Sequence, residues 1–277
     1  TNIVVEETTR AFSKGEQPSF LVTIPQAKLK EVEKEWIKYI RKDSKGKPET
    51  INGEVWMPGA VVKNISPDPI NIYSRLTETQ EGVILTAWIA ITDVAFVSKQ
   101  LNTDQDLAAQ NYIRNFAVDQ YKEAVKGELK NEQDKLKKLE NELDGLIKDE
   151  EKSVKKISEH KRSIERNEAA IVTSKNDQKL KAEQVANQKR VVEQLRNTPG
   201  DAFKEAEKTL KKMEDEQRKL EKEHEKLNRD IDNWNKDIRS EERNIEKSKQ
   251  DQRLKREEIE KQKSVVNEVQ RKLNGIK

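Results

Sequence analysis

Few side chains in this sequence could carry out chemistry. It contains only two histidines, His160 and His224, and no cysteine, so a thiolate nucleophile, a disulfide and a cysteine metal site are all excluded. The sequence has no phosphate-binding loop, no Ser-His-Asp set and no metal-ligand spacing. Both histidines fall in a seven-residue repeat that separates them along a helical rod. We therefore predict no catalytic residue, no cofactor-binding residue, no metal ligand and no cofactor.

Carboxylates are abundant, but their setting predicts a structural role. The chain has 52 Asp and Glu residues against 55 Lys and Arg residues, and the two signs are interleaved. On solvated helix faces such residues are ordinary i,i+4 ion-pair partners. No segment has the dense basic block that is typical of a nucleic-acid or anionic-membrane surface. We predict a protein that is not an enzyme and does not bind nucleic acid.

The composition predicts long helices. Charged residues make up 39% of the chain and hydrophobic residues 32%, which is too polar for one large core. A net charge of only +3 and periodic apolar residues favour coiled coil over disorder. The longest apolar stretch, residues 83 to 91, is far shorter than the roughly 18 residues that span a bilayer. We expect no direct membrane insertion.

The residues before position 103 hold nearly all the strand signals. Strands are expected to begin at Ile3 and to run over 20–24, 54–62, 71–77 and 83–92. The last of these is apolar on both faces, which is typical of a central strand. Pro25 is expected to start a helix, whose buried stripe is Leu29, Val32, Trp36 and Ile40. The prediction is an α+β fold, a small ββαβββ domain.

A long helix should follow and complete this domain. Thr103 is expected to cap it, with Asp106 three residues on. A wide aromatic stripe follows in its first turns: Leu107, Tyr112, Ile113, Phe116, Ala117, Tyr121 and Val125. We expect this stripe to pack on the sheet, which places the globular domain at residues 1–127.

For residues 128–277 we predict a long antiparallel two-helix coiled-coil hairpin. One seven-residue seam begins at Leu129, and a second repeat begins at Phe203 after Thr198-Pro199-Gly200-Asp201. Proline ends a helix, so the turn is expected at 198–201. Two helices of about 70 residues would each span roughly 105 Å, with a left-handed supercoil. Trp234 is expected to fill the seam, and Phe203 to cap the turn.

Two registers of the hairpin fit the repeats. In one, Leu143 faces Lys255 and Glu150 faces Ser248. In the other, apolar residues meet, such as Leu146 with Ile259, and Glu150 pairs with Lys255. Because an unpaired buried charge is costly and a matched pair is tolerable, we predict the second register. It leaves a thin middle around residues 157–164.

Two segments resemble a known group of proteins. Residues 20–25, Phe-Leu-Val-Thr-Ile-Pro, and 33–39, Glu-Lys-Glu-Trp-Ile-Lys-Tyr, are similar to uncharacterised bacterial envelope proteins. In those proteins a small α+β domain follows a signal peptide and precedes a helical tail. The resemblance covers the first hundred residues and implies a periplasmic or otherwise extracytoplasmic location. The absence of cysteine fits an oxidising compartment, and Thr1 in first position predicts that a signal peptide or a tag was removed.

These features predict a structural or protein-interaction component. The globular domain would dock on a protein partner, which could belong to a membrane-associated complex or be a second copy of the chain. The hairpin would act as a rigid arm. The alternative is a periplasmic holdase-type chaperone that holds non-native clients between helical arms, and suppression of the aggregation of unrelated proteins would distinguish it.

Overall fold

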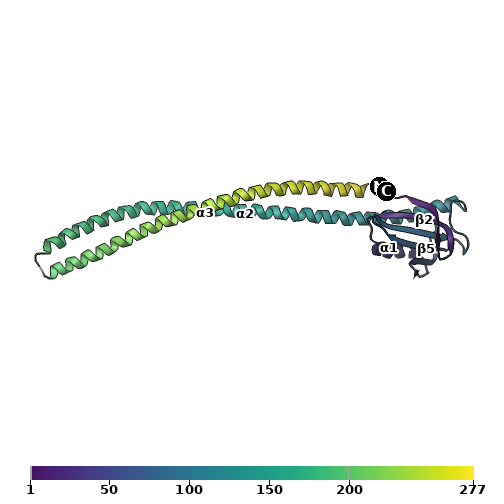
Figure 1. The fold of residues 1–277 in the computed structure, drawn as a ribbon, viewed down its shortest axis with the longest axis horizontal. Coiled ribbons are helices and arrows are strands. Elements are labelled where there is room, and N and C mark those ends of the chain that lie inside the picture. The colour runs from purple at the N-terminus through teal and green to yellow at the C-terminus, as the bar shows by residue number, and fades with distance from the viewer. Residues whose placement is uncertain (1, 199) are drawn as a thin grey trace. The chain divides into compact units, whose positions relative to one another are not determined.

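A computed structural model describes residues 2–198 and 200–277 and has the predicted α+β fold with a helical hairpin (Figure 1). Six strands form one antiparallel sheet in the order β1-β2-β6-β5-β4-β3. The strands are β1 (Val5–Phe12), β2 (Gly15–Pro25), β3 (Glu49–Ile51), β4 (Glu54–Ala60), β5 (Ile70–Glu78) and β6 (Gly82–Ala90). The helices are α1 (Leu29–Arg41), α2 (Thr103–Leu195) and α3 (Asp201–Asn274).

The central strand was predicted correctly. β6 lies between β2 and β5, and all but one of its residues are buried. β5 and β6 form the hairpin expected at Gly82, where the hydroxyl of Thr79 donates to the Gly82 carbonyl at 3.1 Å. An all-apolar strand is therefore buried on both faces, as expected.

One strand and several boundaries differ from the prediction; β2, for example, begins at Gly15 instead of residue 20. β3 was not expected, so the observed order is ββαββββ. The missed signal is Asn52-Gly53, a dipeptide typical of tight hairpins, where both residues have positive φ, 51° and 79°. Pro25 ends β2 instead of starting a helix; α1 begins at Leu29, after Lys28 in an extended conformation. Ile3 and Val4 precede the first strand.

Helices α1 and α2 cover one face of the sheet. The predicted stripe of α1 is confirmed at Val32, Trp36 and Ile40, which are all fully buried. The indole N–H of Trp36 donates to the hydroxyl of Ser74 in β5 at 2.7 Å, which satisfies the polar atoms of both residues inside the core. Partners this deep in the sheet fix α1 in position.

A reciprocal tyrosine pair joins α1 to α2. The hydroxyl of Tyr39 donates to the main-chain carbonyl of Tyr112 at 3.1 Å, and the hydroxyl of Tyr112 donates to the carbonyl of Tyr39 at 3.4 Å. Burial, and then the charge of Asp119, raises the pKa of Tyr39 to about 12. Together with the fully buried Ile113 and Phe116, this pair confirms that the first turns of α2 pack on the globular domain.

The start of α2 corrects two predictions. Asn102, not Thr103, caps the helix: its side-chain oxygen accepts hydrogen bonds from the main-chain N–H groups of Asp104 and Gln105, at 3.0 and 3.1 Å. Asp106 therefore plays no part in a capping box and is instead buried. Leu107, expected in the buried stripe, is 58% exposed because it lies on the opposite side of the helix from the buried Phe116.

The residues fall into two compact units. The first comprises Thr1–Lys138 and Glu260–Lys277, and the second is Leu139–Ile259. In the first unit the end of α3 enters the main core, since Val269 and Ile276 are buried in the same cluster as the sheet residues. The ammonium of Lys272 reinforces this junction, 2.7 Å from the amide oxygen of Gln26 and 2.9 Å from the carboxylate of Glu128.

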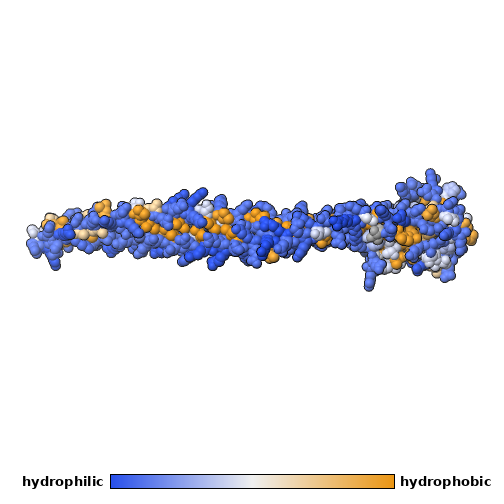
Figure 2. All heavy atoms as spheres, turned by 90° about the horizontal axis from the view of Figure 1, so that it is seen from above, coloured by the Kyte–Doolittle hydropathy of each residue, from blue (hydrophilic) through white to orange (hydrophobic). Residues whose placement is uncertain are grey.

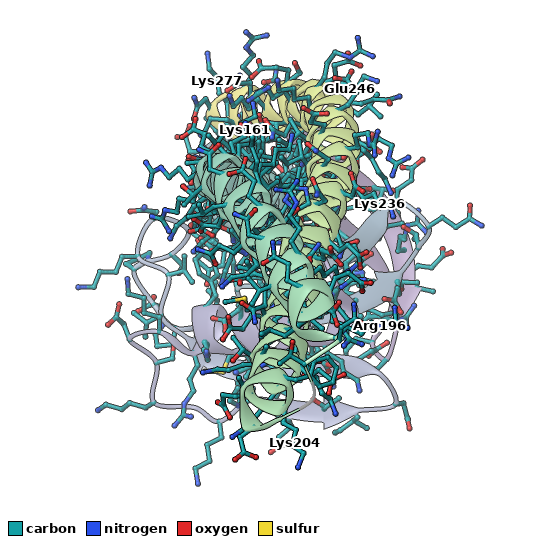
Figure 3. The ribbon with its side chains drawn as sticks, turned by 90° about the vertical axis from the view of Figure 1, so that its left-hand side faces the viewer. Lys161, Arg196, Lys204, Lys236, Glu246 and Lys277 are labelled. Atoms are coloured by element: carbon teal, nitrogen blue, oxygen red, sulfur yellow. The ribbon has the colours of Figure 1, made fainter. Side chains whose placement is uncertain are left out.

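The helices α2 and α3 pack against each other as the predicted antiparallel hairpin. Apolar residues form a broken band along the helical part, surrounded by hydrophilic residues (Figure 2). Lys161, Lys236 and Glu246 point outward from the helices (Figure 3). Trp234 and Phe203 are half-buried. Pro199, in the predicted turn, lies outside the described residues.

The predicted register of the hairpin is wrong. The amide of Gln178 donates to the main-chain carbonyl of Leu220 at 3.1 Å, and the hydroxyl of Ser248 donates to the carbonyl of Leu146 at 3.0 Å. These contacts belong to the alternative register. The expected pair of Glu150 with Lys255 is replaced: Glu150 accepts from Gln252 at 2.6 Å.

The physical reason is that polar seam residues bind the main chain of the facing helix. Side-chain donors cross the seam to main-chain carbonyls at five positions: Asn167 to Leu227, Gln178 to Leu220, Gln188 to Ala206, Ser248 to Leu146 and Gln262 to Glu132. A glutamine side chain can donate its amide hydrogen bond to a main-chain carbonyl while its methylene groups stay packed in the seam. Matching polar residues with one another, as the predicted register did, is therefore unnecessary.

Candidate binding surfaces

The histidines do not form a site. His160 and His224 are both half-buried in the seam of the hairpin. The Gln178–Leu220 contact places His224 opposite Ser174, on the far helix from His160 and roughly 20 Å further along the rod at 1.5 Å per residue. Within residues 2–198 and 200–277, no group of three or more His, Cys, Asp or Glu side chains could hold a metal ion.

None of the described helices is long and apolar enough to cross a membrane.

The face of the sheet opposite α1 and α2 carries an aromatic cluster. Side chains alternate along a strand, so Trp56 of β4, Tyr73 of β5 and Trp88 of β6 lie side by side in one cross-strand row. Phe12 of β1 stacks on Trp88 with ring centroids 4.7 Å apart, and Phe96 packs edge-on against Phe12 at 5.7 Å. We call these five residues the aromatic face.

The aromatic face is only partly covered. Trp88 and Phe96 are buried, whereas Phe12, Trp56 and Tyr73 are half-exposed. The rings of Trp56 and Tyr73 are nearly parallel, 10° apart, with centroids separated by 6.2 Å. The indole N–H of Trp56 is buried and has no hydrogen-bond partner among the described residues. An unsatisfied donor beside two half-exposed rings is a cost to the free chain.

An ion pair borders the aromatic face. The guanidinium of Arg75 lies 2.7 Å from the carboxylate of Glu54 and 5.8 Å from the ring centroid of Trp88. Glu54 also accepts a hydrogen bond from the main-chain N–H of Ser13, so the β1–β2 turn reaches across the face to β4. The Arg75 side chain is 45% exposed. Burial and the charge of Asp93 raise the pKa of Tyr73, which keeps its hydroxyl neutral.

The composition of this face is typical of protein interfaces. Trp, Tyr, Phe and Arg are enriched at interface cores and among the residues that dominate binding energy. The sequence carried a signal for it, because the aromatic residues of β4, β5 and β6 occupy the positions that alternate with core residues, but the predicted strands were not aligned with one another.

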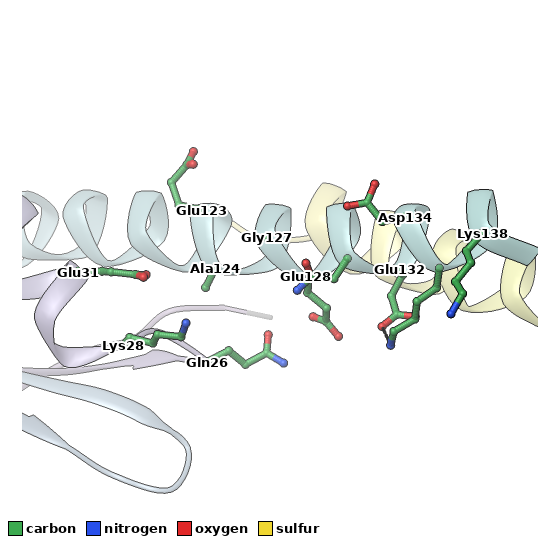
Figure 4. A pocket seen from close by; sticks show the side chains of 12 residues that line it. Gln26, Lys28, Glu31, Glu123, Ala124, Gly127, Glu128, Glu132, Asp134 and Lys138 are labelled. Carbon is green, nitrogen blue, oxygen red and sulfur yellow. Dashed lines mark hydrogen bonds and ion pairs between the residues drawn. The ribbon is translucent and has the colours of Figure 1, made fainter.

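A second candidate surface is a depression between the β2–α1 corner and α2, which we call the basal cleft (Figure 4). It measures about 890 Å³, and α2 forms its wall from Glu123 to Lys138, where Ala124 and Gly127 are the only uncharged, non-amide members. The other side chains that line it are mostly charged, and those of Lys28 and Gln26 extend under α2 from the corner.

Three carboxylates of the basal cleft, those of Glu123, Glu128 and Glu132, are each bound by a lysine. Glu132 binds Lys135 at 2.7 Å and accepts a second hydrogen bond from Gln262 at 2.7 Å, and these two contacts lower its pKa. Glu128 is held by Lys272, as described above. The cleft is therefore an open corner whose carboxylates are largely paired, and it is a weaker candidate than the aromatic face.

Comparison of the sequence with models of known protein families and with curated proteins finds no match. The proposals below therefore rest on the residues themselves.

Proposed function

We propose that this chain is a non-enzymatic protein-interaction component whose globular domain docks on a partner protein. The observation that carries the proposal is the aromatic face, with its half-exposed Trp56, the unpaired indole N–H of that residue, and Arg75 at the border. A partner that supplied a carbonyl to this N–H and covered the rings would recover the cost of leaving them in water.

The hairpin is proposed to act as a rigid arm. Two features support this role: each helix is continuous, and the two are cross-linked at intervals by side-chain-to-carbonyl hydrogen bonds and by ion pairs such as Lys156 with Glu241 at 2.8 Å. At its base, Val269 and Ile276 belong to the core of the globular domain.

The partner is proposed to be a protein, in a membrane-associated complex or as a second copy of the chain, in the periplasm or another extracytoplasmic space. The cysteine-free sequence and the resemblance of residues 20–39 to envelope proteins support this location. The proposal includes neither nucleic-acid binding nor insertion into a bilayer.

The test compares two tryptophan substitutions in the full chain. Complexes would be isolated from the source organism after cross-linking, with wild-type protein, with Trp56→Ala, and with Trp234→Ala as the matched control in the hairpin. We expect Trp56→Ala to lose a partner that wild type and the control retain, with circular dichroism showing all three folded. Retention of every partner by Trp56→Ala would refute docking through this face.

A holdase-type chaperone is the alternative function. The observation that favours it is a set of exposed apolar side chains on α2, including Val154, Val172 and Leu180, which are 52%, 61% and 56% exposed. Suppression of the thermal aggregation of unrelated proteins at equimolar concentration would support the holdase and argue against a dedicated arm.

A further inference from the structure

The two flanks of the hairpin between Leu139 and Ile259 differ in how their charges are paired. On one flank, lysines of α2 lie among glutamates of α3, and Lys189 binds Glu214 at 3.1 Å. On the other flank, which we call the acidic flank, α3 presents an acid at each of four successive heptads: Glu216, Glu223, Asp230 and Asp237.

Lys181, at a seam position of α2, binds Glu216 at 2.9 Å. The row of α2 that faces the acids does not neutralise the other three. At heptad spacing it consists of Ser163, Ala170, Asp177 and Gln184, none of which is basic. The basic residue next in that row, Lys156, is bound to Glu241. Hairpin flanks normally carry complementary charges that stabilise the pairing, so this flank leaves negative charge that the hairpin does not use.

A groove lies on the acidic flank nearer the base of this unit. It has a volume of about 530 Å³ and lies between α2 and α3. Its rim carries four carboxylates, those of Glu142, Asp149, Asp251 and Glu258, and Gly145, Leu146 and Leu254 also line it. Leu254 is 47% exposed, so the groove combines accessible apolar surface with an acidic rim.

One ammonium group of the hairpin itself, that of Lys255, is already bound at the rim of the groove. The Nζ of Lys255 lies between two carboxylates of the rim, 2.9 Å from Glu142 and 2.7 Å from Glu258. One helical turn away, Asp251 is half-buried and has no ion pair or hydrogen bond among the described residues. Asp149 faces it and is bound only by the exposed Lys152 of its own helix, at 2.8 Å.

Gly145 is an independent indication that something approaches here. Glycine in a helix interior is destabilising relative to alanine. A Cβ atom at Gly145 would meet no atom within 4 Å, so no crowding inside the hairpin requires the glycine. It does keep this side of the groove open, and close approach by another chain is a common reason for a glycine.

We propose that this groove binds a lysine- or arginine-rich helical segment of a partner protein. A basic side chain of that helix would enter between Asp149 and Asp251, as Lys255 does between its two glutamates, and an apolar side chain one turn away would cover Leu254. The heptad spacing of the acids on this flank fits a third helix, whose own side chains repeat at the same interval. The inference adds a second binding surface to the proposed arm.

The probe is a synthetic three-heptad helical peptide with lysine and leucine one turn apart, and binding to the full chain is measured by calorimetry at low and moderate salt. The control peptide has glutamate in place of lysine. We expect the basic peptide to bind and the acidic one not to, with affinity falling as salt rises. Equal binding of both peptides, or none, would overturn the proposal.

Two pairs of variants localise the site. The double substitution Asp149→Lys with Asp251→Lys should weaken binding at least about tenfold, because it replaces attraction by repulsion. The matched double substitution Glu168→Lys with Glu242→Lys, on the opposite flank, should leave binding within about twofold. Equal loss in both would show that the peptide responds only to net charge and would refute the groove.

A third variant separates binding from folding. Gly145→Gln adds a side chain to the groove, its Cβ atom meets no atom within 4 Å, and helix propensity rises. We expect a more stable hairpin that no longer binds the peptide, and unchanged affinity in this variant would also refute the groove. The Trp56→Ala variant should bind the peptide normally, so failure of the groove and failure of docking through the aromatic face are distinguishable.

Discussion

The side-chain amide of Gln178 in α2 donates a hydrogen bond to the main-chain carbonyl of Leu220 in α3, 3.1 Å away. This contact and the similar one from Gln188 to Ala206 tie a particular residue of one helix to a particular residue of the other. If α3 slipped by one heptad against α2, each of these amides and its methylene groups would face different residues. Polar seam residues therefore specify the register, as single polar residues do in other coiled coils.

The register can be tested with engineered disulfides. We expect cysteines at 150 and 248 to form a disulfide readily under mild oxidation, because the Ser248–Leu146 contact places these positions opposite each other. Cysteines at 150 and 255 should remain reduced, since that pair is offset by a heptad. Gel mobility without reductant measures both. Faster oxidation of the 150–255 pair would contradict the observed register.

Removing the two glutamine hydrogen bonds across the seam should raise the stability of the hairpin and make its register less specific. The double substitution Gln178→Leu with Gln188→Leu buries more apolar surface and removes two hydrogen bonds worth about 1 kcal/mol each. We expect a midpoint of urea unfolding equal to or above that of wild type. In this background the 150–255 disulfide should become detectable. A strictly wild-type disulfide pattern would show that other contacts set the register.

The contrast between the predicted and observed hairpin shows what a heptad pattern contains. The pattern located both helices and the break between them, because apolar spacing alone determines which face is buried. It could not select the register, because two alignments bring comparable numbers of apolar residues together. The choice depends on where each long amide finds a carbonyl, and every helix offers carbonyls at every residue.

The aromatic face illustrates a similar limit in the globular domain. Core residues such as Trp36 and Ile113 were predicted from helical spacing and are buried. The row of Trp56, Tyr73 and Trp88 depends on the pairing register of three strands, which no local pattern determines. The strand signals therefore predicted the sheet but not the aromatic face that forms on its surface.

Asp106 should make the stability of the globular domain depend on pH. It is 4% exposed and one of its carboxylate oxygens has no partner among the described residues, and burial together with the charge of Glu7 raises its pKa from 3.8. The folded state then holds the proton more tightly than the unfolded state. The stabilising contribution is present below pH 3.8 and is lost as pH rises through the folded pKa.

The substitution Asp106→Asn removes this titration. Urea unfolding between pH 4 and neutral pH should show the free energy of unfolding declining more with rising pH in wild type than in the variant. Glu168→Gln, at an exposed position of the hairpin, is the control and should keep the wild-type slope. Identical slopes for wild type and Asp106→Asn would mean that the carboxyl is ionised without cost in the folded protein.

The predicted domain boundary at residue 127 can be tested with two fragments. A fragment of residues 1–127 retains Ile113, Phe116 and Val125 on the sheet and should fold, although less stably than the full chain. A fragment of residues 1–102 lacks them and should aggregate, because it exposes the sheet face that they cover. Amide hydrogen exchange and light scattering distinguish the two outcomes. Equal solubility with native exchange in both would place the boundary before α2.

The return of α3 to the globular domain should be energetically important. Ile276 is 3% exposed and lies in the main core cluster, beside Val269 and close to the end of the chain. The substitution Ile276→Ser removes buried methyl groups and places a hydroxyl in their position, which should lower the free energy of unfolding of the globular domain by about 2–4 kcal/mol.

The matched control is Val265→Ser, at a position of the same helix that is 39% exposed, where the loss should be below about 0.5 kcal/mol. The ratio of exchange rates in β6 amides between wild type and each variant measures the effect locally, since these amides exchange by global opening of the sheet. If α3 only rests against the domain, both variants will leave β6 exchange unchanged. A selective increase for Ile276→Ser would show that the arm and the domain share one folding unit at the base, which is the condition for an arm that holds its direction.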